Sequence, residues 1–65
     1  MKIILNSKDK MIKTSNLKRM LLSLRYDPER VIVSVNGALV EKNKFFKIAL
    51  SDGDIVEVFS FVGGG

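Results

Sequence analysis

The stretch LSDGDIVEVFSFVGGG, residues 50–65, combines a turn, a strand and a run of glycines. Residues 51–54 contain Asp-Gly-Asp, which is typical of a tight turn. Residues 55–62 follow as a predicted β-strand, and its two faces differ because successive strand residues point to opposite sides. We assign to the core the face formed by Val56, Val58, Ser60 and Val62.

The other face of this strand carries Ile55, Glu57, Phe59 and Phe61. We expect Ile4 and Ile32 to extend it from neighbouring strands. Contiguous exposed apolar patches usually mark interfaces, so we predict that this face binds a partner protein. Two alternatives remain. Residues 41–50 could cover the face, or the assignment could be wrong by one residue, which would exchange the two faces.

The first half of the chain predicts a hairpin and one helix. Residues 2–6 and 11–14 are predicted strands, joined by a polar turn at residues 7–10. Ser15 occupies the position of a helix N-cap. Apolar residues then recur with the spacing of one helix face. They are Leu17, Met20, Leu21 and Leu24. Pro28 is expected to end any helical option at this point.

The second half predicts more strands of the same sheet. Val31, Val33 and Val35 share one face of a predicted strand, and Asn36-Gly37 is the strongest tight-turn signal in the chain. Residues 38–40 are therefore a returning short strand, followed by a compact connection with a short helical turn. This order predicts an α+β fold, with a mixed sheet of four to five strands covered on one face by a helix. The predicted sheet core is Ile3, Leu5, Val33, Val35, Val56 and Val58.

Composition excludes several classes of function. The chain has 65 residues, enough for one small domain, and it contains no Cys and no His. Disulfides, thiolate sites and histidine chemistry are therefore excluded, and the acidic residues lack the spacing of calcium loops or zinc enzymes. We expect no metal and no bound cofactor. The early polar residues do not suit a signal peptide, and no apolar run is long enough to cross a membrane, so we expect a cytoplasmic protein.

The net charge of +4 is uneven. Residues 1–30 carry eight Lys or Arg and three Asp or Glu, whereas residues 31–65 carry three and four. A basic half suits nucleic acid or an acidic protein surface. Only Tyr26 is an aromatic near these cations, so a platform for stacked bases is missing and nucleic acid is disfavoured. We interpret the basic half as a solvated face, and a basic nucleic-acid-binding or interaction module is the alternative from a different class.

The second half resembles the ThiS family of ubiquitin-like sulfur carriers (ThiS/MoaD). Residues 35–37 resemble its apolar-Asn-Gly turn, residues 50–57 its apolar-x-x-Gly-Asp-x-Val segment, and residues 61–65 its end. Phe45 stands where those proteins often have Trp. The resemblance covers the chain in length and element order, and it is specific over residues 33–65. A third glycine and the basic net charge depart from the family pattern.

The resemblance implies a β-grasp domain at residues 1–62, followed by a flexible glycine tail at residues 63–65. It also implies that the carboxylate of Gly65 is the reactive group. An ionised α-carboxylate is a poor electrophile. The resemblance therefore implies that an ATP-using activating enzyme adenylates it. Sulfur from a donor protein would then convert it to a thiocarboxylate, which a thiazole synthase uses in thiamine biosynthesis.

In this hypothesis the chain is a protein cosubstrate rather than an enzyme, and it is a monomer when free. Gly64 and Gly63 would supply a thin tail that can enter a partner's active site, since glycine has no Cβ. The predicted partner-binding residues are Phe59, Phe61, Ile55 and Ile4. Alternatives within the same fold are the small subunit of molybdopterin synthase and a protein-conjugating modifier. The former often has proline before its glycines, where this chain has Ser60-Phe61-Val62. A chain end without function is the alternative for the tail.

Overall fold

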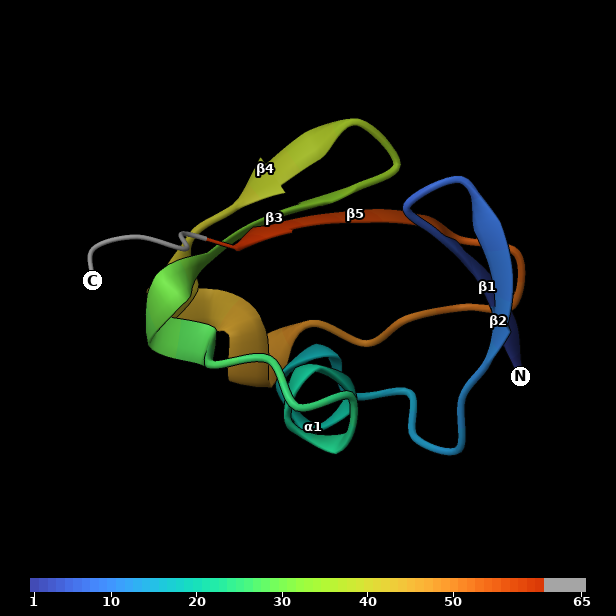
Figure 1. Ribbon diagram of the computed structural model, residues 1–65, viewed down its shortest axis with the longest axis horizontal. Helices are drawn as coiled ribbons and strands as arrows, with labels where there is room; N and C mark the ends of the chain where they lie inside the picture. The colour runs from blue at the N-terminus through green and yellow to red at the C-terminus, as the bar shows by residue number, and fades with distance from the viewer. Residues whose placement is uncertain (61–65) are drawn as a thin grey trace.

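The computed structural model describes residues 1–60; Phe61, Val62 and the predicted tail at residues 63–65 lie outside the described residues. The observed order confirms the predicted one, a hairpin, a helix, a second hairpin, a connection and a last strand (Figure 1). The elements are β1 (Lys2–Leu5), β2 (Lys8–Met11), α1 (Leu17–Ser23), the 3-10 helix η1 (Pro28–Arg30), β3 (Val31–Val35), β4 (Ala38–Val40), the 3-10 helix η2 (Lys42–Lys47) and β5 (Ile55–Ser60).

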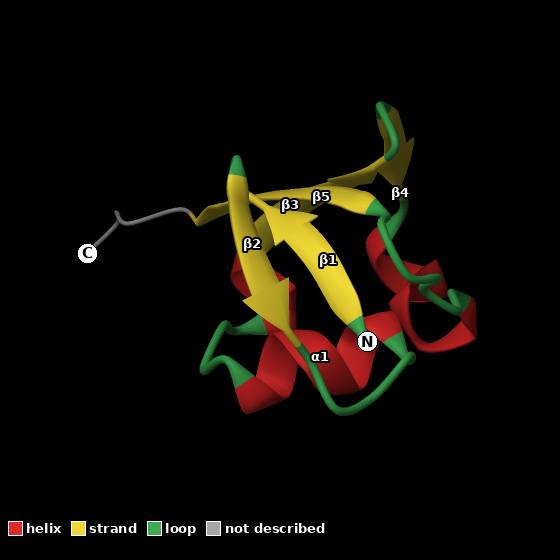
Figure 2. Cartoon of the chain, turned by 90° about the vertical axis from the view of Figure 1, so that its right-hand side faces the viewer, coloured by secondary structure: helices red, strands yellow, loops and turns green. Residues whose placement is uncertain are grey.

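The five strands form one mixed sheet in the order β2-β1-β5-β3-β4. The last strand, β5, lies in the centre, parallel to β1 and antiparallel to β3. Helix α1 and both 3-10 helices lie on the same side of this sheet (Figures 1 and 2). The predicted α+β architecture is therefore confirmed, with one sheet face covered and the other facing away from the helices.

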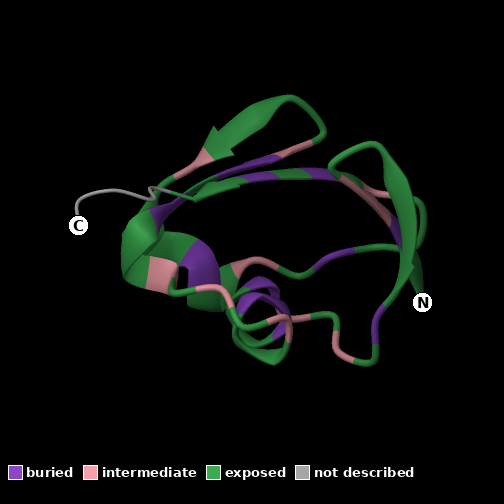
Figure 3. Cartoon of the chain, in the orientation of Figure 1, coloured by how far each residue is buried: buried purple, intermediate pink, exposed green. Residues whose placement is uncertain are grey.

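The core lies between α1 and the covered face of the sheet (Figure 3). Leu17, Met20 and Leu21 are fully buried, as the helical spacing predicts, and Leu24 is partly buried. Phe45 is 1% exposed and reaches this core from η2. The buried residues of the sheet include Ile3, Val31, Val33, Val56 and Val58, and Leu5 and Val35 pack against them.

The first hairpin differs from its prediction. Its second strand is Lys8–Met11 rather than residues 11–14, and its turn is Asn6-Ser7 rather than residues 7–10. Both turn residues have positive φ, 49° and 71°, as in the two-residue turns that suit strand twist. The prediction was wrong because every residue of β2 is exposed, and an edge strand of this kind needs no apolar alternation.

The start of α1 is one residue later than predicted. Asn16, rather than Ser15, is the N-cap, and its Oδ1 accepts a hydrogen bond from the backbone N–H of Arg19 at 3.0 Å. The carbonyl of Ser15 instead accepts from the backbone N–H of Leu50 at 2.6 Å. Ser15 is therefore tied to the segment before β5, a contact between distant parts of the chain that no local pattern contains.

Two further expectations need correction. Pro28 begins the short helix η1 instead of excluding helical geometry, because proline suits the first position of a helix. Asp27 caps this turn by accepting from the backbone N–H of Glu29 at 2.9 Å. Ser60 shares a face with the buried Val58 but is exposed, since it lies at the end of the ladder opposite the first residue of β3.

Candidate functional site

The candidate site is the sheet face that turns away from the helices. Ile55, Phe59 and Ile32 on this face are 49%, 59% and 41% exposed, while Ile4 is half-buried. The alternating residues Val56 and Val58 are buried, so the one-residue slip is excluded. The connection at residues 41–50 packs on the helix side, because η2 contacts α1. It therefore leaves this face uncovered.

Strand register brings the predicted residues together in two pairs. Phe59 lies directly opposite Ile32 of β3, and Ile55 lies opposite Ile4 of β1. Side chains opposite one another on neighbouring strands contact each other and stabilise the sheet. Four predicted residues thus form two apolar pairs across the central strand, and Phe61 lies outside the described residues.

A polar pair separates the two apolar pairs. Glu57 lies between Ile55 and Phe59 on β5, opposite Ser34 of β3. The Ser34 hydroxyl donates to Glu57 Oε1 at 3.3 Å. Ser34 is only 9% exposed, so this hydrogen bond satisfies its hydroxyl within the sheet. The face therefore presents a carboxylate with apolar groups on both sides rather than a continuous apolar surface.

Two residues on this face were missed by the sequence analysis. Met11 lies opposite Lys2, which shares the outward face with Ile4, and Leu39 lies opposite Ser34. They are 71% and 75% exposed, more than any other large apolar side chain of the described residues. The two-residue turn at Asn36-Gly37 would have revealed Leu39, because it sets the pairing of the flanking strands. Met11 was missed because the second strand was predicted at residues 11–14, whereas it is Lys8–Met11.

Hydrogen bonds anchor the start of the central strand. The Asn36 side chain accepts from the backbone N–H of Ile55 at 2.9 Å and donates to Asp54 Oδ1 at 3.0 Å. The second carboxylate oxygen of Asp54 accepts from the backbone N–H of Ser51 at 2.7 Å. The Asn-Gly turn and the Asp-Gly-Asp turn are therefore joined by side chains. This connection sets where β5 begins, and β5 leads directly into residue 61.

Within residues 1–60, no group of three or more Asp or Glu side chains is arranged to hold a metal ion. Over the same residues, every buried side-chain nitrogen or oxygen has a hydrogen-bond partner. No helix in the described range is long and apolar enough to span a membrane. What these residues do offer is an exposed face built on a strand that is anchored at its start.

The profile of the ThiS family matches residues 3–65. The chain belongs to the ThiS family. The sulfur carrier protein ThiS of Bacillus subtilis (strain 168) is 35% identical over 63 residues, which cover 94% of this chain and 96% of that protein. The crystal structure of the thiamine biosynthesis protein ThiS from Geobacter metallireducens superposes with a TM-score of 0.83 at 32% identity, and the match covers 100% of both chains. The predicted family and the β-grasp fold are confirmed.

The ThiS-like chain also resembles segments of longer proteins. A thiazole synthase from Paramagnetospirillum magneticum is 32% identical over 66 residues, which cover all of this chain and 20% of that protein. A thiazole synthase from Magnetococcus marinus is 35% identical over 51 residues, covering 78% of this chain and 16% of that protein. The chain therefore spans at most about a fifth of the length of these two relatives.

Proposed function

We propose that this chain carries sulfur in thiamine biosynthesis as a thiocarboxylate on Gly65. The observation that carries this proposal is its similarity, over nearly the full length of both chains, to the sulfur carrier protein ThiS of B. subtilis. The family profile extends through residue 65, so it includes the three glycines. This membership favours thiamine biosynthesis over molybdopterin synthesis.

The proposed chemistry needs two displacements. The Gly65 carboxylate attacks the α-phosphorus of ATP and releases pyrophosphate, which leaves an acyl adenylate. Hydrosulfide released by a donor protein then attacks the carbonyl carbon, and AMP departs as the carbon–sulfur bond of the thiocarboxylate forms. Gly64 and Gly63 let the backbone enter the active site of the activating enzyme, because they carry no side chain. The ATP is bound by that enzyme and not by this chain.

We propose three protein partners, an activating enzyme, a sulfur donor and a thiazole synthase. Segments like this chain occur within two thiazole synthases, which supports a synthase as the partner that receives the sulfur. In this proposal the partners bind the outward sheet face through Phe59, Ile55 and Ile4. Phe61 would join this surface next to the tail. Docking there would place Gly65 beyond the end of β5, within reach of a bound nucleotide.

The experiment is mass spectrometry of the intact protein. The mass of the protein purified from its native cell shows whether Gly65 ends the working chain. After incubation with an activating enzyme, ATP and a sulfur source, we expect a gain equal to the mass difference between sulfur and oxygen. The B. subtilis carrier serves as the positive control in the same reaction. If that carrier gains sulfur with its own enzyme and this chain gains none with the enzyme of its own cell, the proposal is wrong.

A further inference from the structure

The cations of this chain that form no ion pair within residues 1–60 are concentrated in one stretch of the sequence. Four of the eleven Lys and Arg residues form ion pairs with carboxylates, which leaves seven without an ion pair within residues 1–60. The seven are Lys8, Lys10, Lys13, Lys18, Arg19, Arg25 and Lys47. Six of them lie from Lys8 at the start of β2 to Arg25, the second residue after α1, so the excess of positive charge belongs to one stretch of the chain.

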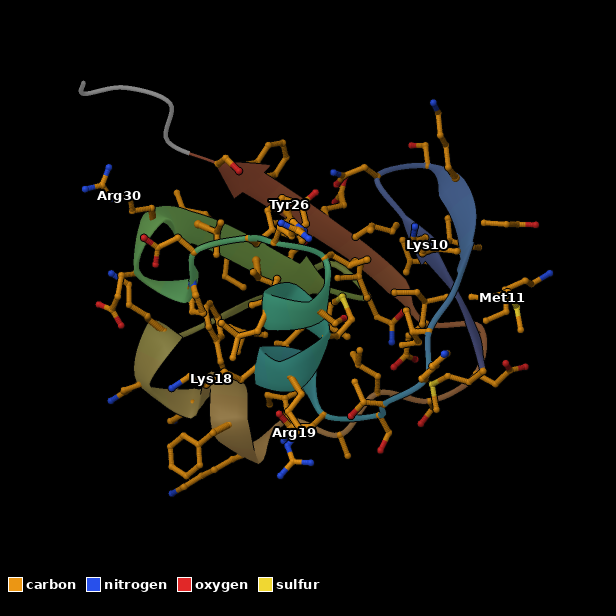
Figure 4. All side chains as sticks on the ribbon, turned by 60° about the horizontal axis from the view of Figure 1, so that its bottom comes forward. Lys10, Met11, Lys18, Arg19, Tyr26 and Arg30 are labelled. Carbon is orange, nitrogen blue, oxygen red and sulfur yellow. The ribbon has the colours of Figure 1, made fainter. Side chains whose placement is uncertain are left out.

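Two of these cations line an open cleft between β2 and the end of α1. The cleft has a volume of about 600 Å³, and its apolar lining comes from Leu5, Leu24 and Tyr26. Lys8 and Lys10 stand opposite Leu5 and Ile3 in the hairpin, so both point to the helix side of the sheet. In Figure 4, Lys10 and Tyr26 lie in the upper half of the view, and Lys18 lies in the lower half.

The backbone of β2 is open for pairing along this cleft. Among the strands of residues 1–60, β2 is an edge strand that pairs only with β1. Met1 and Ile12 exchange backbone hydrogen bonds at 2.8 and 3.0 Å, which sets the alternation of the ladder. In an antiparallel ladder every second residue bonds to the neighbouring strand. The backbone N–H and C=O of Lys10 therefore bond to β1, whereas those of Asp9 and Met11 point away from the sheet.

We propose that the β2 edge binds an extended acidic segment of a partner protein, which adds to the sheet as a further strand. Main-chain hydrogen bonds to Asp9 and Met11 would supply affinity, as in other cases of strand addition. Every second side chain of the segment would face Lys8 and Lys10 above the apolar lining. The one carboxylate at the cleft, that of Asp9, pairs with Lys2 at 3.5 Å.

Two other roles for these residues agree less well with the structure. Lysines on an edge strand deter unwanted pairing, but that role does not require an apolar cleft beside them. Nucleic acid would need exposed aromatic rings for stacking, and Tyr26 is half-buried with its side chain packed against the core. The proposal uses the backbone of β2 and the side chains of Lys8 and Lys10 rather than Phe59, Ile55 or the carboxylate of Gly65, so it does not depend on the proposed sulfur transfer.

The test is a nuclear magnetic resonance titration of the ¹⁵N-labelled chain with a blocked peptide of alternating valine and glutamate. We expect saturable shifts at residues 8–11 and 24–26, and none with the valine–lysine peptide of equal length. Strand addition uses one edge of the peptide. N-methylation of the valines removes the N–H donors of one edge, and N-methylation of the glutamates removes those of the other. One of these two methylated peptides should therefore lose binding. Equal binding by both methylated peptides, or no saturable shift with the parent peptide, would overturn the proposal.

Variants of matched charge identify the surface. Lys8→Glu with Lys10→Glu should weaken binding at least about tenfold, because both charges face the peptide. Lys18→Glu with Lys47→Glu changes the net charge equally on another part of the surface and should weaken it far less. Equal weakening by both pairs would mean that only net charge matters. A single-stranded oligonucleotide could also shift the signals of residues 8–11 and 24–26 with the same affinity as the peptide. That result would show that the surface binds polyanions in general, and it would overturn the proposal of an acidic protein segment.

Discussion

Asn6 joins the first hairpin to the central strand through two hydrogen bonds to the backbone of Val58. Asn6 Nδ2 donates to the Val58 carbonyl at 3.2 Å, and Asn6 Oδ1 accepts from the Val58 N–H at 2.8 Å. The backbone N–H of Asn6 also donates to the Val56 carbonyl at 3.0 Å. One side chain thus continues the parallel β1–β5 ladder beyond the end of β1, and it holds the strand that precedes the tail.

Asn6→Ala should lower the free energy of unfolding by about 1–3 kcal/mol. It removes two hydrogen bonds of about 1 kcal/mol each. Alanine also fits the φ of 49° less well than asparagine, because it has no side-chain amide to form a local hydrogen bond there. Asn6→Gly loses the same bonds but tolerates the backbone, so its loss should be smaller. Urea denaturation of the three proteins measures this. Equal midpoints for the alanine variant and the parent chain would show that the bonds add nothing.

Arg25 offers a second measurement of backbone strain. It follows α1 with φ 67°, and the N–H groups of Arg25 and Tyr26 donate back to Leu22 and Leu21, a helix end at which glycine is usual. Arg25→Gly should therefore be more stable than Arg25→Ala by about 1 kcal/mol, since both lose the charge and only alanine keeps the strain. Thermal melts compare the two variants, and a more stable alanine variant would contradict this account.

Phe59→Glu should weaken binding to the activating enzyme or to the synthase by about 2 kcal/mol or more if Phe59 is an interface anchor. Its side chain is 59% exposed, so stability should change by less than about 0.5 kcal/mol. Phe46→Glu is the matched control, because Phe46 is 57% exposed and lies on η2. Isothermal titration calorimetry measures both variants. Similar losses for both would mean that the sheet face is not the docking surface.

Deletion of Gly65 tests the proposed reactive end. The shortened chain still ends in two glycines, but its carboxylate lies about 3.5 Å short of its former reach. A displacement of about 1 Å can already cost about a hundredfold in rate, so adenylation should fall steeply. Gly64→Val should also impair it by adding a branched side chain. ATP–pyrophosphate exchange with the cognate activating enzyme measures both, and full activity in both variants would mean that Gly65 is not the reactive residue.

Local patterns in the sequence determined most of the architecture. The facing of residues 55–59 and the helical spacing of Leu17, Met20 and Leu21 predicted which of these side chains are buried, because each pattern arises from the geometry of a single element. Asn36-Gly37 predicted a hairpin for the same local reason. With the motifs of the second half, these patterns also predicted the ThiS family, which the family profile confirms.

Contacts between distant residues decided the rest. Asn16 rather than Ser15 is the N-cap of α1, because the carbonyl of Ser15 bonds to Leu50. Strand β2 begins at Lys8, because Asn6 adopts a positive φ in the turn and its side chain binds β5. Met11 and Leu39 joined the outward face only through strand register, which local composition does not encode. The sequence determined that the chain is basic; only the tertiary structure decided which cations are paired, because an ion pair depends on the distance between side chains in space.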